Sequence, residues 1–248
     1  MTSSASDGAA AAAGTARDTL TIPQRVAGML MHPARTLAGA IRDRRWGALL
    51  LVATLAAGGA GAGVMSTVTG QQAFVDGWER TAAAFGVPLD HQGYAQLRTS
   101  RRWAPAYAAA AALVAIPLAA AGAALALQST LGRGTGVPFA AVMAMTVHAG
   151  VVLMLRQLAS AALTYASEST VNRLTLASWF PGVDPASALA RPLGFVDLFV
   201  VWWIVLLALG TAVLYGRSAR RVMGAFLVLY LTVAVLAATL LALAGGRV

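Results

Sequence analysis

The chain has 248 residues and a net charge of +9, with 58% hydrophobic and only 11% charged residues. Soluble domains carry about 25% charged residues, so this composition argues against a water-soluble protein. The arginines stand at the ends of apolar stretches, where cations flank membrane spans, and this placement argues against nucleic acid as a partner. The chain has no cysteine, which excludes disulfides, thiol nucleophiles and cysteine metal sites.

Residues 1–20 begin the chain with a segment rich in alanine, serine and glycine. Such a composition buries little apolar surface and therefore predicts a disordered tail. The segment also lacks a basic stretch followed by an apolar core, which is the pattern typical of a secretory signal peptide.

Residues 21–46 predict a basic amphipathic segment that lies at the membrane interface. Pro23 can open a helix, and His32-Pro33 would end it and start a second one. In the second piece Leu37 and Ile41 share one face, and the rest carries the predicted membrane-surface arginines Arg35, Arg42, Arg44 and Arg45. This pattern suits the headgroups of an anionic leaflet; a short solvated linker is the alternative.

Five apolar stretches follow, each long enough to cross a bilayer as a helix, because about 20 apolar residues span about 30 Å of hydrocarbon. We expect these spans at about 47–68, 104–127, 138–163, 195–215 and 222–244. The predicted fold is an all-α integral membrane protein with five transmembrane helices and interfacial amphipathic helices. In the first span Gly59 and Gly63 have the small-xxx-small spacing that favours close packing, here within the same bundle.

The first long connection, residues 70–102, carries an aromatic pattern. Phe74, Trp78 and Phe85 fall on one helical face. Aromatic side chains on one face indicate an amphipathic helix that lies on the membrane, with its rings at the headgroup level. The alternative interpretation is a lid over a partner or a ligand.

The remaining connections and the arginine count define a topology. Residues 164–194 contain two short helical candidates, at 171–179 and 185–190. With the N-terminus in the cytoplasm, ten arginines lie on that side and seven on the other, which the positive-inside rule favours. The lysine-free composition, rich in alanine and glycine, is typical of a GC-rich genome, so we expect the bacterial cytoplasmic membrane.

Motifs that carry chemistry are missing from the sequence. It has no H-E-x-x-H zinc helix, no G-x-x-x-x-G-K-[ST] phosphate loop and no G-x-S-x-G elbow. The three histidines are scattered along the chain without evident co-ligands. We therefore expect no catalytic residue, no metal site and no bound cofactor.

The apolar spans contain few ionisable residues. His148, near the middle of the third span, is either a functional group or a neutral histidine that is hydrogen-bonded to a neighbouring helix. Arg156 in the same span and Asp197 at the start of the fourth should reach a similar depth, so we predict that they pair. The competing interpretation is that Arg156 snorkels to the interface while Asp197 caps its helix.

Three pieces of the sequence carry a family resemblance. Residues 31–37 form a proline-containing stretch before the first span, residues 171–174 lead to 193–202 at the fourth, and residues 216–221 form a basic turn before the fifth. In these pieces the chain resembles the Yip family of five-span membrane proteins (Ypt/Rab-interacting proteins and their bacterial relatives). The resemblance implies a five-span fold and, in eukaryotic members, vesicle traffic and binding of prenylated Rab GTPases.

Two functions remain open at this point. The first is a non-enzymatic adaptor or membrane-organising subunit, which associates with the lipid bilayer and with other membrane proteins as a homo- or hetero-oligomer. The second is a component of a small-molecule transporter or channel, which would need polar groups along a path through the spans. An intramembrane enzyme is the least favoured class, because no nucleophile and base stand at helical spacing.

Overall fold

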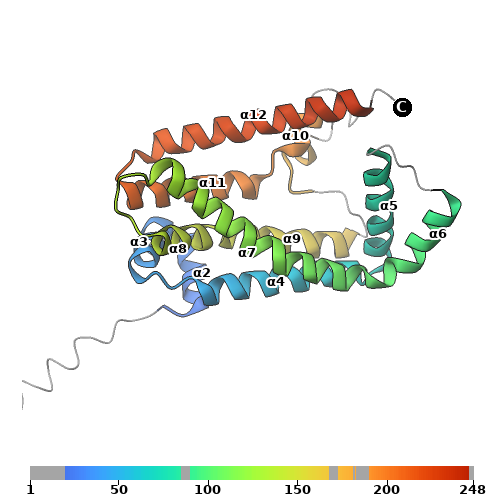
Figure 1. Cartoon of the computed structure of the whole chain (residues 1–248), viewed down its shortest axis with the longest axis horizontal. Coiled ribbons are helices and arrows are strands. Elements are labelled where there is room, and N and C mark those ends of the chain that lie inside the picture. Colours follow the sequence, from blue (N-terminus) through green and yellow to red (C-terminus); the bar gives the residue numbers. More distant parts are fainter. Residues whose placement is uncertain (1–19, 85–89, 168–172, 181, 183–189, 246–248) are drawn as a thin grey trace, which may run out of the picture.

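The computed structural model describes residues 20–84, 90–167, 173–180, 182 and 190–245, and the named elements in this part of the chain are all helices (Figure 1). Five helical segments are long and apolar enough to cross a membrane: Gly47–Met65, His91–Leu131, Phe139–Ser167, Leu198–Tyr215 and Ala219–Leu240. The prediction of an all-α integral membrane protein with five transmembrane helices is confirmed. The predicted tail (apart from Leu20), Phe85 and residues 185–189 lie outside the described residues.

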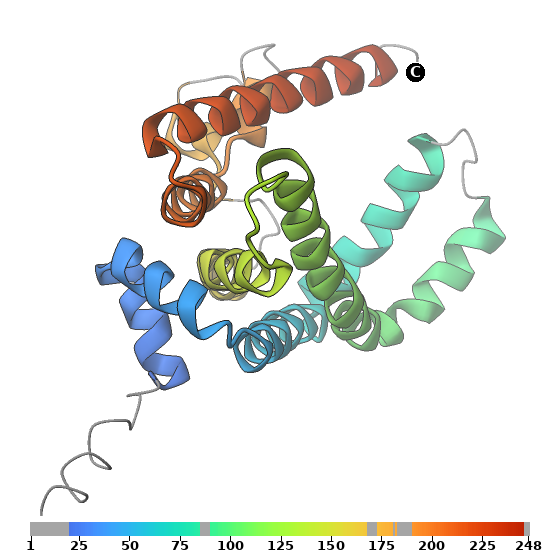
Figure 2. The same cartoon turned by 60° about the vertical axis from the view of Figure 1, so that its left-hand side comes forward.

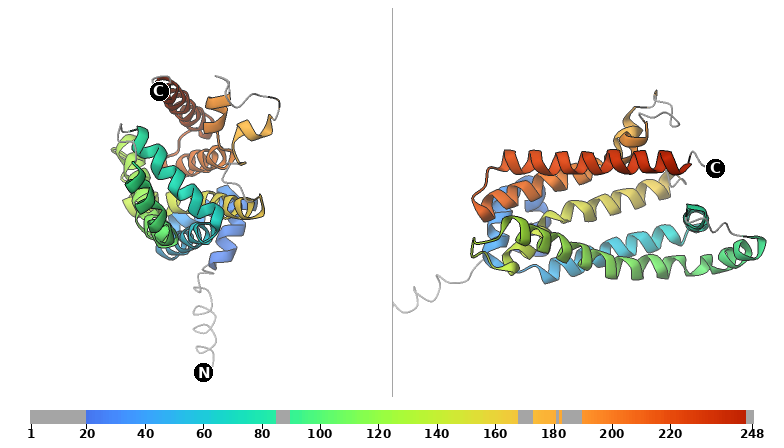
Figure 3. Two further views of the ribbon diagram at one scale, coloured as in Figure 1. Left: turned by 90° about the vertical axis from the view of Figure 1, so that its right-hand side faces the viewer. Right: turned by 45° about the horizontal axis from the view of Figure 1, so that its top comes forward.

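The spanning helices run along the long axis of the molecule (Figures 1 and 3). They are α4 (Gly47–Met65), α7 (Ala104–Leu131), α8 (Phe139–Ala149) with α9 (Val151–Ser167), α11 (Leu198–Tyr215) and α12 (Ala219–Gly245). Helices α2 (Ile22–Met31) and α3 (Pro33–Asp43) lie at one end of the bundle, and α5 (Val68–Ala84) and α6 (His91–Ser100) lie at the other. Figure 2 shows α12 on the outside of the bundle, beside α11.

The third span is the core of the bundle. It was predicted as one helix, and the structure interrupts it at Gly150, between α8 and α9. Every residue from Ala141 to Ala149 is buried, and α8 packs against α2, α3, α7 and α11. A helix that is apolar all round is typical of a buried position. The α8 sequence has no ionisable residue apart from its one histidine, which explains why α8 occupies the centre.

Helices α2 and α3 form a pair that we call the platform. The two helices meet at His32, where the sequence predicts a break, because Pro33 cannot continue α2 but is favoured at the start of α3. A Cβ atom on Gly28 would lie 2.6 Å from Oγ1 of Thr36, so the glycine permits the close approach. Met29 and Leu37 are fully buried and join the core cluster. The platform is thus part of the packed bundle as well as a surface segment.

The glycines at the contact between α4 and α7 are not the ones that the sequence predicted. A Cβ atom added to Gly59 or Gly63 would meet no atom of a neighbouring helix within 4 Å, so the expectation that these two glycines make the close contact was wrong. A Cβ on Gly58 would lie 3.3 Å from the Cβ of Ala112, and one on Gly61 would lie 3.7 Å from that of Ala108. The small-xxx-small pattern failed because small residues surround it on every face of this helix.

The connection after the first span is helical on both sides of its undescribed residues. Phe74 and Trp78 of α5 pack edge to face with each other and with Tyr107 of α7, at centroid distances of 5.8 to 6.3 Å. The second helix, α6, was not predicted; Asp90 caps it by accepting a hydrogen bond from the Gly93 amide at 2.7 Å. The aromatic face of α5 therefore packs in part against the second span.

The described part of the candidate helix 171–179 is less helical than predicted. Of the candidate helix 171–179, the structure describes only a short 3₁₀ turn, η2 (Leu176–Trp179). The reason is an alternative backbone pairing: the Leu176 amide donates to the Val196 carbonyl at 2.7 Å, and the Leu198 amide donates to that of Leu174 at 3.3 Å. Helix α10 (Ala190–Phe195) then leads to α11, which begins three residues later than the predicted span.

Candidate functional site

Arg156 and Asp197 lie in direct contact between α9 and the start of α11. The Arg156 Nε atom donates to Asp197 Oδ2 at 2.6 Å. The Asp197 side chain is 6% exposed and the Arg156 side chain 28% exposed. The second carboxylate oxygen of Asp197 accepts from the amides of Phe199 at 2.9 Å and Val200 at 3.3 Å. Capping and ion pairing, which the sequence presented as competing interpretations, are therefore both present, one on each oxygen.

The same position ties the last span to the bundle. The backbone amide of Asp197 donates to the Tyr230 hydroxyl of α12 at 3.0 Å, and that hydroxyl donates to the Phe195 carbonyl at 2.7 Å. Arg156, Asp197 and Tyr230 thus connect α9, α11 and α12. This arrangement fixes three helices at one depth and leaves no carboxylate oxygen of Asp197 without a partner.

A second buried polar contact joins α2 to α8. The Arg25 side chain is only 8% exposed, and its Nη1 atom lies 3.2 Å from His148 Nε2. The Nδ1 atom of His148 lies 2.7 Å from the Ala144 carbonyl. Because a carbonyl only accepts, Nδ1 carries the proton, and Nε2 accepts from Arg25. His148 is therefore a neutral histidine bonded to a neighbouring helix, the second of the two interpretations left open by the sequence.

Arg25 is the residue that sequence reasoning missed, because it enters the prediction only as one of the ten arginines on the cytoplasmic side. A signal was available in its spacing. Ile22, Arg25 and Met29 stand at positions i, i+3 and i+7 of α2, which places the arginine on the apolar face. An arginine on such a face needs a buried partner, and α8 supplies it.

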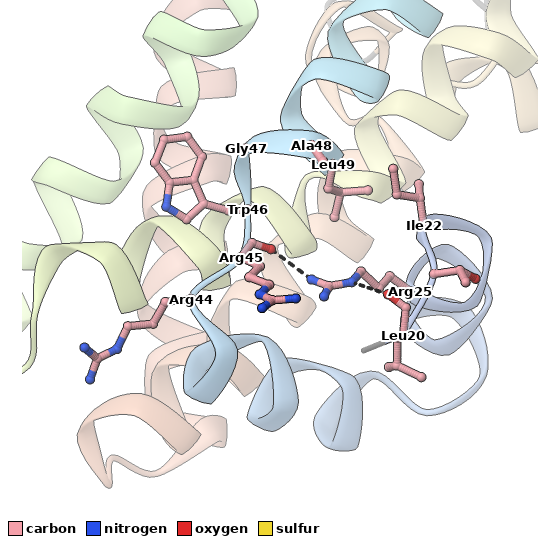
Figure 4. Close-up of a pocket in the computed structure, with 10 residues that line it drawn as sticks. Leu20, Ile22, Arg25, Arg44, Arg45, Trp46, Gly47, Ala48 and Leu49 are labelled. Carbon is pink, nitrogen blue, oxygen red and sulfur yellow. Dashed lines mark hydrogen bonds between the residues drawn. The ribbon is translucent and has the colours of Figure 1, made fainter. Parts of the chain in front are cut away.

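The four predicted surface arginines are all exposed, but two of them have a further role. Arg44 and Arg45 line a cavity of about 640 Å³ together with Arg25 and Trp46, whereas Arg35 and Arg42 do not line it (Figure 4). The cavity lies between the start of α2 and the start of α4. Arg44 has a left-handed backbone with φ 54°, which ends α3 and turns the chain toward the first span.

A second cavity of about 600 Å³ lies among α4, α7, α8, α9 and α11. Small residues of α4 and α7, such as Gly61 and Ala108, form much of the cavity wall. The side chains with polar atoms at its lining are Thr146, Arg156, Gln157 and Trp203. Among the described residues no group of three or more histidine, aspartate or glutamate side chains could hold a metal ion.

Comparison with known proteins identifies the family. The model of the Yip1 domain matches residues 27–242, which include the last turns of α2 and all five spanning helices. Neither the curated proteins nor the solved structures that were compared with the chain gave a match. The family match covers most of the sequence. The chain therefore belongs to the Yip1 domain family of integral membrane proteins.

Proposed function

We propose that the protein is a non-enzymatic membrane adaptor or organising subunit whose partners are other membrane proteins. In this proposal it resides in a bacterial cytoplasmic membrane, with the platform on the cytoplasmic side. The arginine asymmetry of the loops supports this orientation. Homo- or hetero-oligomers are both compatible with the function.

The observation that carries the proposal is the docked platform. Its inner face is anchored by Met29, Leu37 and Arg25, which are all buried. Its outer face exposes Leu30 at 40% and Met31 at 74%. A rigid surface with exposed apolar and cationic side chains beside the membrane fits recognition of a protein partner, because aromatic, methionine and arginine side chains are favoured in interfaces.

The buried polar groups support a structural role. Arg156 and Asp197 join three spanning helices, and Arg25 and His148 join the platform to the core. Each of these groups uses hydrogen bonds to hold helices together. Ionisable residues inside a membrane are a functional hypothesis by default, and here their partners favour bundle assembly as their role.

The test is quantitative co-purification from native membranes in a mild detergent. We expect a stoichiometric partner with the wild-type chain and its loss with R35E, which reverses an exposed charge on the platform. The matched control is R98E, which makes the same change at an exposed position of α6, at the opposite end of the bundle. Equal partner recovery from wild type and R35E would refute the platform as the docking surface.

The second candidate function is a transporter component, which the 600 Å³ cavity favours. Ligand cavities commonly have volumes of about 300–1,000 Å³ with a few polar groups in an apolar wall. The indole nitrogen of Trp203, which lines this cavity, is buried without a hydrogen-bond partner among the described residues. Solute flux in liposomes that contain the purified protein alone would support transport, and A115W, which fills the cavity wall, should abolish that flux.

A further inference from the structure

We propose that the 640 Å³ cavity at the start of the first span binds the phosphate group of an anionic phospholipid headgroup. The cavity is bounded by the start of α2, by the link from α3 to α4, and by the first turn of α4 (Figure 4). Arg25 comes from α2, and Arg44 and Arg45 come from the link; the side chains of Arg25 and Arg45 point toward the same space, whereas that of Arg44 extends away from it (Figure 4). The proposal does not depend on the adaptor function, because it concerns a lipid and not a protein partner.

The first argument is uncompensated positive charge. Arg156 and Asp197 form the one ion pair within 4.0 Å among the described residues, so no described carboxylate oxygen lies within 4.0 Å of the charged nitrogens of Arg25, Arg44 or Arg45. The case is strongest for Arg25, which is only 8% exposed. A buried charge without a counter-charge is unfavourable, and an anion in the cavity would remove that cost.

The second argument is a set of unused donors. Arg25 donates from Nε to the Leu20 carbonyl at 3.0 Å and from Nη1 to the Arg45 carbonyl at 2.9 Å. Its other terminal nitrogen, Nη2, has no hydrogen-bond partner in the described part of the chain. The carbonyl bonds hold the guanidinium group in place, so its free edge is already oriented for a ligand (Figure 4).

The amino end of α4 adds backbone donors on the same cavity. Trp46 stands at the N-cap and makes no side-chain capping bond. The first amides of a helix have no partner within the helix, and the residues that carry them here, Gly47, Ala48 and Leu49, line the cavity. Free amides at a helix start attract phosphate through direct donation and through the helix dipole. These backbone amides and the guanidinium groups together provide hydrogen-bond donors for the oxygen atoms of a phosphate group.

The position of the cavity identifies a lipid as the source of the phosphate. It lies where the first membrane span begins, which is the level of the headgroups. Leu20, Ile22 and Leu49 form an apolar part of its wall, which suits the glycerol and the first carbons of an acyl chain. Trp46 stands beside it, as interfacial tryptophans do.

The test measures binding of short-chain lipids to the purified full chain after exchange into lipid-free detergent. We use dioctanoyl phosphatidylglycerol, dioctanoyl phosphatidylcholine and inorganic phosphate as probes. The two double variants are R44Q/R45Q, which removes exposed charges at the cavity, and R35Q/R42Q, which removes two exposed charges elsewhere on α3. Ligand-free melting of each variant shows that it is folded.

We expect the phosphatidylglycerol affinity to fall at least tenfold in R44Q/R45Q and less than twofold in R35Q/R42Q. Phosphatidylcholine, which has no net charge, should bind at least tenfold more weakly than phosphatidylglycerol to the wild type. Equal losses in the two double variants would overturn the proposal, because they indicate diffuse attraction to the whole basic surface. Inorganic phosphate that binds as tightly as the lipid would overturn the lipid as the source.

Discussion

Substitutions at Arg156 and Asp197 can separate the contribution of the ion pair to stability from the contribution of the helix cap. We consider R156M, D197N, their combination, and D197A. Asparagine is as good as aspartate at an N-cap, so D197N keeps the two amide contacts of Phe199 and Val200 while removing the charge. D197A removes both the cap and the charge.

The expected magnitudes follow from the geometry. Removing one member of a buried ion pair costs about 3–5 kcal/mol, and the 28% exposure of Arg156 reduces this to about 2 kcal/mol for D197N. D197A should cost about 1 kcal/mol more, because the cap is also lost. The double variant R156M/D197N should cost less than the sum of the single variants by about 1–2 kcal/mol.

The assay is reversible unfolding in mixed micelles, followed by tryptophan fluorescence. Each variant gives a free energy of unfolding, and the cycle gives the coupling energy between the two side chains. Losses that are additive within error would refute the pair, leaving Arg156 to snorkel and Asp197 to act only as a cap. Equal stability of D197N and D197A would refute the capping part of the reasoning.

Three glycine substitutions test the packing. G210A should destabilise the protein by about 1–3 kcal/mol, because its Cβ would lie 2.5 Å from Cγ of the fully buried Met145; G224A, with open space around it, should not. G70A should be more harmful still, because its Cβ would lie 2.0 Å from the Val64 carbonyl oxygen, and backbone cannot move aside as a side chain does. Thermal unfolding of these variants checks both expectations, and a stable G70A would contradict the described turn between α4 and α5.

Length and hydropathy were sufficient to predict the five spans, because a membrane-crossing helix needs a long apolar run and little else. The start of α3 was also predictable, since Pro33 restricts the backbone wherever it stands. The glycine contacts were not, because α4 offers small residues on all faces and only the position of α7 selects Gly58 and Gly61.

The candidate site was predictable in part. Similar depth alone indicated that Arg156 and Asp197 could meet. The contact of Arg25 with His148 joins residues 123 positions apart, and it depends on how the platform folds back onto α8. The cavity with Arg44 and Arg45 likewise exists only after α2, α3 and α4 are placed together.

The measurement that tests the central claim most directly is site-specific photo-crosslinking in native membranes. A photoreactive residue replaces Met31, which is 74% exposed on the platform, or Val68, which is 82% exposed at the start of α5 at the opposite end of the bundle. The adaptor account predicts one discrete protein adduct from position 31, lost when R35E is added, and no such adduct from position 68. The same adduct from both positions, or an adduct from position 68 alone, would contradict the account.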